Sequence, residues 1–200
     1  MPVEWQFPDG VVRLGGTGAK KTIEAEDASR QEATARAIVD DLAQRPGVVL
    51  ADEVGMGKTF VALAVVASVI ESTPASAGPV VVMVPPGLLS KWPRDWDLFR
   101  KQCVVGGRLG KVRDETARNA TEFFKLLDDP VARRARLIWM PTSCFSQKLG
   151  DGWVKLGLIR LARRYTKMDE EMKRRLYKWA PDLVRLKRHR TLTPLSLIHI

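Results

Sequence analysis

The chain has 200 residues and is 45% hydrophobic, which suits one domain with an apolar core. Its net charge of +10 favours a polyanionic partner, of which nucleic acid is the first candidate. Two cysteines and two histidines without metal-ligand spacing argue against a zinc module. The N-terminus lacks a secretory signal pattern, and the longest apolar run, residues 60–70, is too short to span a bilayer. We therefore expect no membrane partner and a cytoplasmic location, associated with the nucleoid if the source is bacterial.

Residues 1–23 predict an irregular N-terminal segment, because prolines and glycines recur through them. Residues 15–22 partly match a phosphate-binding loop, but Ala19 replaces the last glycine and no adequate apolar strand precedes it. We interpret this stretch as a flexible loop. Residues 24–45 are rich in Ala, Glu and Arg and carry an apolar stripe, which predicts a helix.

The most informative stretch is residues 48–59. Its apolar start, residues 48–51, predicts a strand, and an apolar helix is predicted over residues 58–70. Between them lies a loop that contains Gly55 and Gly57 and ends in Gly-Lys-Thr, the layout of a phosphate-binding loop. The glycines let backbone N–H groups turn toward an anion, which the positive end of the helix also attracts.

The same loop predicts a nucleotide site. The Lys58 ammonium can reach the β- and γ-phosphates of ATP, and the Thr59 hydroxyl can bind Mg²⁺, so we assign catalytic roles to these two residues. A strict phosphate-binding loop has glycine where this chain has Asp52, and the alternative is an ordinary glycine turn between a strand and a helix. The predicted ATP-binding residues of the loop are Asp52, Glu53, Val54, Gly55, Met56, Gly57, Lys58 and Thr59.

The elements after the loop alternate between strands and helices. Residues 80–84 are a continuous apolar run, which predicts a central strand of a parallel sheet covered on both faces. We further expect a helix over residues 93–101, a short strand at 103–105, an amphipathic helix over 114–128 and a buried strand over 137–140. This alternation predicts an α/β fold with a doubly wound parallel sheet, and the candidate motifs fall at the carboxyl ends of its strands.

Two motifs resemble those of a known family. Residues 52–59, Asp-Glu-x-Gly-x-Gly-Lys-Thr, resemble motif I of Swi/Snf-like ATPases, a branch of the superfamily-two helicases and DNA translocases in which the leading Asp is usual. Residues 81–92, Val-Val-Met-Val-Pro-Pro-x-Leu-Leu-x-x-Trp, resemble motif Ia of that family. The resemblance covers residues 29–145. It implies an incomplete RecA-like P-loop domain over residues 24–150, with a parallel sheet flanked by helices.

The resemblance also implies further site residues. In the family, the turn that follows the strand of motif Ia lies against a DNA backbone, and a hydroxyl-bearing pair after a later strand helps to hold the tracked DNA strand. A glutamine upstream of the phosphate loop reads the adenine edge, a role that Gln31 would take, and a solvated helix glutamine is the alternative. The implied nucleic-acid contacts are Pro86, Ser90, Lys91, Thr142 and Ser143.

The C-terminal part of the chain differs in character. Residues 151–194 hold 13 Lys and Arg but five Asp and Glu, which predicts a basic helical insertion or lid that is either a DNA-backbone contact or the solvated face of a helical hairpin. Residues 195–200 resemble a translated sequencing adapter, so we expect a non-native tail, with a native apolar tail as the alternative. The Asp-Glu pairs at 114–115 and 169–170 lie in polar helical contexts. ATPases of this family also need motif II, an Asp-Glu pair after an apolar strand, and a second RecA-like lobe. Because neither pair follows an apolar strand, we expect the chain to be truncated before motif II and the second lobe.

Together these patterns predict the N-terminal fragment of an ATP-dependent DNA translocase that uses ATP and Mg²⁺ on duplex DNA. The fragment alone is expected not to hydrolyse ATP efficiently, because the acidic motif and the second lobe complete the catalytic site. One alternative is a strand-separating helicase that acts on DNA or RNA. Another, from a different class, is a non-catalytic nucleic-acid-binding module that uses its basic segment.

Overall fold

The computed structural model describes residues 5–16, 23–53, 55–74 and 76–145, and in addition Gly157, Glu170, Glu171 and Arg174. The predictions for Val54, for residues 17–22 and for nearly all of residues 146–200 therefore lie outside the described residues. None of the described helices combines the length and the hydropathy that a membrane crossing requires.

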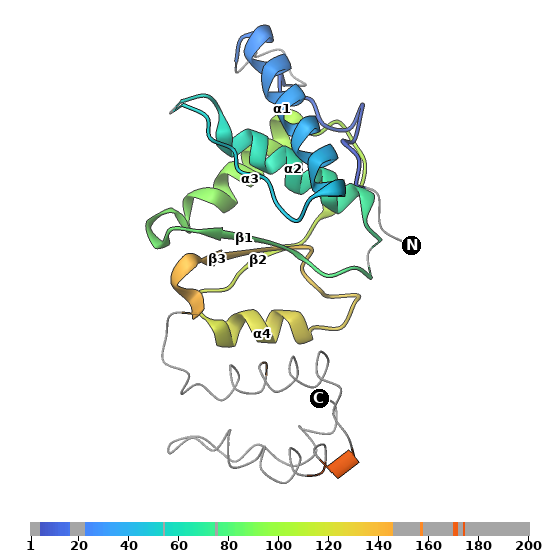
Figure 1. Ribbon diagram of the computed structural model, residues 1–200, viewed down its shortest axis with the longest axis vertical. Coiled ribbons are helices and arrows are strands. Elements are labelled where there is room, and N and C mark those ends of the chain that lie inside the picture. The colour runs from blue at the N-terminus through green and yellow to red at the C-terminus, as the bar shows by residue number, and fades with distance from the viewer. Residues whose placement is uncertain are drawn as a thin grey trace.

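A small parallel sheet organises the described chain (Figure 1). Its three strands stand in the order β1-β3-β2, with β1 at Val80–Val84, β2 at Asp114–Thr116 and β3 at Leu137–Pro141. Both pairings are parallel, and Val84 at the end of β1 pairs with Pro141 at the end of β3. The two strands therefore end level with each other, and the predicted α/β class with a parallel sheet is confirmed.

Helices lie on both faces of the sheet. α1 (Ala25–Gln44), α2 (Lys58–Ser72) and α3 (Lys91–Cys103) lie on one side, and α4 (Ala120–Asp128) lies on the other (Figure 1). The first three helices begin and end within two residues of their predicted bounds. Local signals explain this agreement, because apolar spacing and flanking Gly and Pro residues mark helix ends without reference to the rest of the fold.

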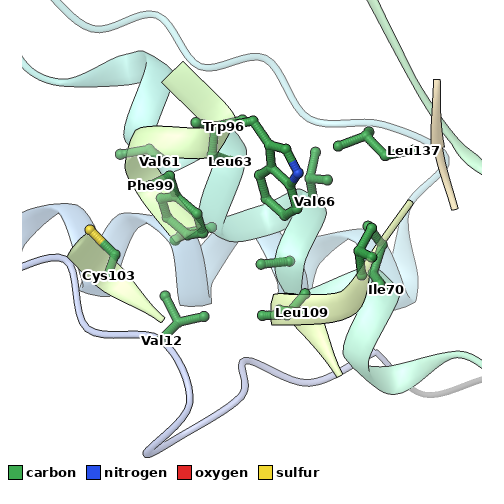
Figure 2. Packing of buried hydrophobic residues seen from close by; sticks show 14 of the residues in the cluster. Val12, Val61, Leu63, Val66, Ile70, Trp96, Phe99, Cys103, Leu109 and Leu137 are labelled. Carbon is green, nitrogen blue, oxygen red and sulfur yellow. The ribbon is translucent and has the colours of Figure 1, made fainter. Parts of the chain in front are cut away.

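The strand β3 divides the core into two clusters. All five of its residues are buried, and successive side chains point to opposite faces. Leu137 and Trp139 join the main cluster with α2 and α3, in which Trp96 stacks on Phe99 with ring centroids 5.6 Å apart; Figure 2 shows Leu137, Trp96 and Phe99 in this cluster. The smaller cluster beside α4 contains Ala117, Ala120, Ala135, Ile138, Met140 and Cys144. β3 is thus covered on both faces.

The N-terminal segment 5–16 packs against the helices. Phe7, Val12 and Leu14 are buried in the main cluster, and Val12 forms a single antiparallel bridge with the residue that follows α3. The Leu14 N–H donates a hydrogen bond to Glu32 Oε1 of α1 at 2.7 Å. The predicted irregular segment therefore contributes apolar side chains to the core.

Two predicted strands are wrong or reduced. Residues 48–51 form no strand, and Val49 is 89% exposed. An apolar run becomes a strand only when a neighbouring strand satisfies its backbone groups, and none of the described strands pairs with this run. The strand expected at 103–105 reduces to the bridge at Val104, because Cys103 is still the last residue of α3.

The position of β1 in the sheet also differs from the prediction. Residues 80–84 do form a strand, but among the described strands it lies at the edge of the sheet and not in its centre. Val80 and Val82 pack against the main cluster, whereas Val81 is 37% exposed and Met83 is 49% exposed. A continuous apolar run thus gave the strand correctly without giving its place in the sheet.

The helix predicted over 114–128 is half wrong. Asp114–Thr116 is the edge strand β2, and helix α4 begins only at Ala120. Asn119 is its N-cap, and its side-chain oxygen accepts a hydrogen bond from the Glu122 N–H at 2.9 Å. Pairing with β3 and this cap override the helical periodicity of the first part of the stretch.

Candidate nucleotide-binding site

The loop before α2 has the backbone shape that the glycine pattern predicts. Gly55 has φ of +94° and Gly57 has φ of +78°, a region that residues with a Cβ rarely adopt. Gly57 is the N-cap of α2, and its carbonyl accepts a hydrogen bond from the Phe60 N–H at 2.9 Å. The N-terminus of a 15-residue apolar helix therefore opens directly at the loop, an arrangement that favours an anion.

The Lys58 side chain folds back over this loop. Its Nζ donates to the backbone carbonyl oxygen of Asp52 at 2.6 Å and to that of Glu53. Thr59 follows in the first turn of α2 and is half-buried. The ammonium group thus already lies within the loop, held by groups that a phosphate could replace.

Gln31 of α1 packs against the same loop. Gln31 is only 5% exposed. It lies so close to Gly57 that a Cβ added to this glycine would be 2.2 Å from Gln31 Nε2. The alternative of a solvated helix glutamine is therefore wrong. The structure brings Gln31 and the loop before α2 together, whereas phosphate binding by this loop and recognition of adenine by Gln31 stay predictions.

Sequence reasoning missed Arg30, which also contacts the loop. Its guanidinium lies 3.4 Å from the Asp52 carboxylate and 3.3 Å from the Met56 carbonyl oxygen. The available signal was its place beside Gln31 on α1. That signal does not reveal a contact with residues 22 and 26 positions further along the chain.

The predicted nucleic-acid contacts after β1 lie on an exposed turn. Pro86 begins a short 3₁₀ helix, Ser90 is the N-cap of α3, and Lys91 is its first residue; all three residues are exposed. The Lys91 Nζ lies 2.9 Å from Asp95 Oδ2 in a solvent-accessible ion pair. A pair of this kind is weak and can exchange its carboxylate for a phosphate.

The predicted nucleic-acid contacts after β3 lie at the same end of the sheet as those after β1. Thr142 and Ser143 are exposed in a short 3₁₀ helix that starts directly after β3. Since β1 and β3 are parallel neighbours that end level, the turns after them start at the same end of the sheet. In Figure 1 the carboxyl ends of β1 and β3 and the loop before α2 lie on the same side of the molecule. The parallel pairing therefore groups the two sets of predicted nucleic-acid contacts at the carboxyl ends of β1 and β3.

The donor set of the loop fits Mg²⁺ bound together with a nucleotide. Mg²⁺ commonly takes one or two protein oxygens and completes its shell with substrate phosphates and water, and the Thr59 hydroxyl would be such an oxygen. Among the residues that the structure describes, no three His, Cys, Asp or Glu side chains gather into a group that could hold a metal by themselves. A cation at this loop would depend on the phosphates.

The two cysteines are poorly suited to nucleophilic chemistry. Burial raises the pKa of the Cys103 thiol to about 11, and the nearby Glu32 carboxylate adds to the shift. Burial also raises the pKa of Cys144, with a smaller contribution from Glu122. Both thiols are therefore protonated at neutral pH, and both belong to the core.

The site consists of two positive-φ glycines at a helix N-terminus, a lysine folded over the loop and a buried glutamine behind it. Arg30 adds a second cation to this loop, where it pairs with Asp52. No protein-family model, curated protein or solved structure matches the chain.

Proposed function

We propose that this chain is the ATP-binding lobe of a Swi/Snf-like, superfamily-two DNA translocase with a RecA-like fold. The observation that carries the proposal is Lys58 folded over a loop whose Gly57 starts α2 and packs against buried Gln31. A small parallel sheet flanked by helices is compatible with such a lobe. The resemblance of residues 52–59 and 81–92 to motifs I and Ia supplies the family.

The residues of the loop would divide the work of binding Mg²⁺ and ATP. Lys58 would exchange the carbonyl oxygens of Asp52 and Glu53 for phosphate oxygens, at small cost in hydrogen bonds because each lost bond is replaced. The Thr59 hydroxyl would hold Mg²⁺, which when bound offsets the negative charge of the phosphates. Gln31 would pair its amide with the adenine edge, since an amide donates and accepts at once.

Duplex DNA would lie along the end of the sheet at which β1 and β3 finish. Exposed Ser90 and Lys91, together with Thr142 and Ser143, offer hydroxyl and ammonium donors to phosphate oxygens there. These groups carry no base-specific pattern, so the proposed contact is independent of DNA sequence. The net charge of +10 would strengthen it at low salt.

Two substitutions separate nucleotide binding from DNA binding in the 200-residue chain. Lys58→Ala should lose binding of a fluorescent ATP analogue in the presence of Mg²⁺ and retain binding of a labelled duplex. Lys91→Ala should show the reverse, with a salt dependence of DNA binding that is shallower by about one phosphate contact. Lys101→Ala, an exposed lysine near the other end of α3, serves as the control for both assays.

The outcomes decide between the classes of function. Loss of nucleotide binding in Lys58→Ala alone supports the ATP-binding lobe. A wild-type chain that binds duplex DNA but binds no ATP analogue would overturn the proposal and leave the non-catalytic nucleic-acid-binding module. A chain whose Lys91→Ala variant binds DNA like the wild type would remove the turn after β1 from the interface.

A further inference from the structure

Arg30 reaches the phosphate-binding loop from α1 and touches it at both ends. Its Nη1 lies 3.4 Å from Asp52 Oδ2, at the start of the loop, and its Nη2 lies 3.3 Å from the Met56 carbonyl oxygen, just before α2. The same Nη2 lies 3.3 Å from Asp27 Oδ1, about one turn back on α1. One guanidinium therefore ties the two ends of the loop to each other and to α1.

The contact with Met56 bears on the direction of a backbone donor. In a trans peptide the carbonyl and the N–H of the next residue point in opposite directions. The Met56 carbonyl is drawn toward Arg30, so the Gly57 N–H points away from Arg30. Because Gly57 is the N-cap of α2 and has positive φ, this peptide could otherwise turn over at low cost.

The contact with Asp52 bears on the charge of the loop. Asp52 and Glu53 bring two carboxylates into the loop whose backbone carbonyl oxygens hold the Lys58 ammonium, and negative charges in this loop oppose the binding of a triphosphate. Arg30 balances one of them. The side chains of Arg30 and Asp52 are 34% and 27% exposed, so solvent screens this pair less than it screens a fully exposed one.

We propose that Arg30 is the positioning residue of the phosphate-binding loop and that it sets the affinity of the loop for a nucleoside triphosphate. It does so by fixing the peptide between Met56 and Gly57 and by compensating the charge of Asp52. This inference rests on the proposed function. It differs from the expected family roles, which assign phosphate to Lys58, Mg²⁺ to Thr59 and adenine to Gln31.

Four variants test the role of Arg30. Arg30→Met removes both contacts and should weaken binding of Mg²⁺ and a fluorescent ATP analogue by about tenfold, the typical value of one hydrogen bond to a charged group. Arg30→Lys should lose less, because it keeps the charge. Adding Asp52→Asn to Arg30→Met should recover part of the loss. Arg36→Met is the matched control on α1, since Arg36 pairs with Asp9 and lies outside the loop contacts.

A second measurement does not need a nucleotide. Hydrogen exchange of the backbone amides of residues 52–57 should be faster in Arg30→Met than in the wild type, while exchange of α2 stays the same. Arg36→Met should leave the exchange of the loop unchanged. A purely structural role of Arg30 would instead lower the midpoint of thermal unfolding without a selective change at the loop.

The outcomes distinguish this inference from the proposed function. If the wild type binds the analogue and Arg30→Met binds it equally well, the role of Arg30 is disproved and the proposed function stands. Equal losses in Arg30→Met and Arg36→Met would disprove it too, because they would show a general effect on folding. If the wild type binds no analogue, the proposed function fails, and the affinity role of Arg30 fails with it.

Discussion

Gly57 carries two constraints that can be separated by substitution. An alanine there would have to adopt φ of +78° and would also place its Cβ 2.2 Å from Gln31 Nε2. Gly55 has φ of +94°, but its added Cβ would meet no atom within 4 Å. Gly55→Ala should therefore cost only the left-handed backbone, about 1–2 kcal/mol, whereas Gly57→Ala should cost more and also displace Gln31.

Urea unfolding and nucleotide titration of the two glycine variants check this prediction. Gly57→Ala should show the lower free energy of unfolding and the weaker nucleotide binding. Adding Gln31→Ala to the Gly57→Ala variant should restore part of the lost free energy of unfolding, because it removes the clash between the new Cβ and the glutamine side chain. Equal behaviour of Gly55→Ala and Gly57→Ala would contradict the packing of Gln31 on the loop.

Cys103 gives the chain a pH-dependent stability at alkaline pH. Burial raises the pKa of its thiol from 9.0 to about 11, so the folded state holds the proton more tightly than the unfolded state. This contribution is complete below pH 9 and is lost as the pH rises to about 11, by at most about 1.4 kcal/mol for each pH unit. Cys103→Ala should be less stable overall but should lose less stability across this range. Parallel pH curves for wild type and variant would refute the assignment.

Among the secondary-structure elements, the edge strand β2 is supported by a part-buried hydrogen bond between the side chains of Asp114 and Trp139. The Trp139 indole N–H donates to Asp114 Oδ2 at 2.8 Å, and Trp139 is fully buried in β3. Asp114→Ala would leave that N–H unpaired and should destabilise the fold by about 1–3 kcal/mol. Glu115→Ala removes only an exposed ion pair with Arg113 and should cost at most about 1 kcal/mol. Chemical denaturation compares the two variants, and similar losses would argue against the bond as the support of β2.

The same elements show which parts of the fold the sequence determines locally. Helices α1, α2 and α3 follow from apolar spacing within each segment, and β1 and β3 from uninterrupted apolar runs. β2 was missed because Asp114-Glu115-Thr116 has little strand propensity and becomes a strand through pairing with β3. The opposite error occurred at residues 48–51, which have the composition of a strand but no strand partner among the described residues.

Across the molecule, the parts of the candidate site that could be predicted are those whose residues lie close together in the sequence. Lys58, Gly57 and the helix that follows them are contiguous, so a motif revealed them together. Arg30 meets the loop only through the packing of α1 against α2, and no local pattern encodes that contact. The common edge of the turns after β1 and β3 likewise follows from the parallel pairing of strands more than 50 residues apart.

Nucleotide binding by the loop before α2 can be tested directly by calorimetric titration of the 200-residue chain with ATP and Mg²⁺, beside Lys58→Ala and the control Lys101→Ala. We predict saturable binding by the wild type and by Lys101→Ala, and affinity at least about tenfold lower in Lys58→Ala, because the ammonium makes charge-assisted bonds to the phosphates. A wild type that releases no heat of binding, or a Lys58→Ala variant that binds as tightly as the wild type, would contradict the assignment of this loop as the ATP site.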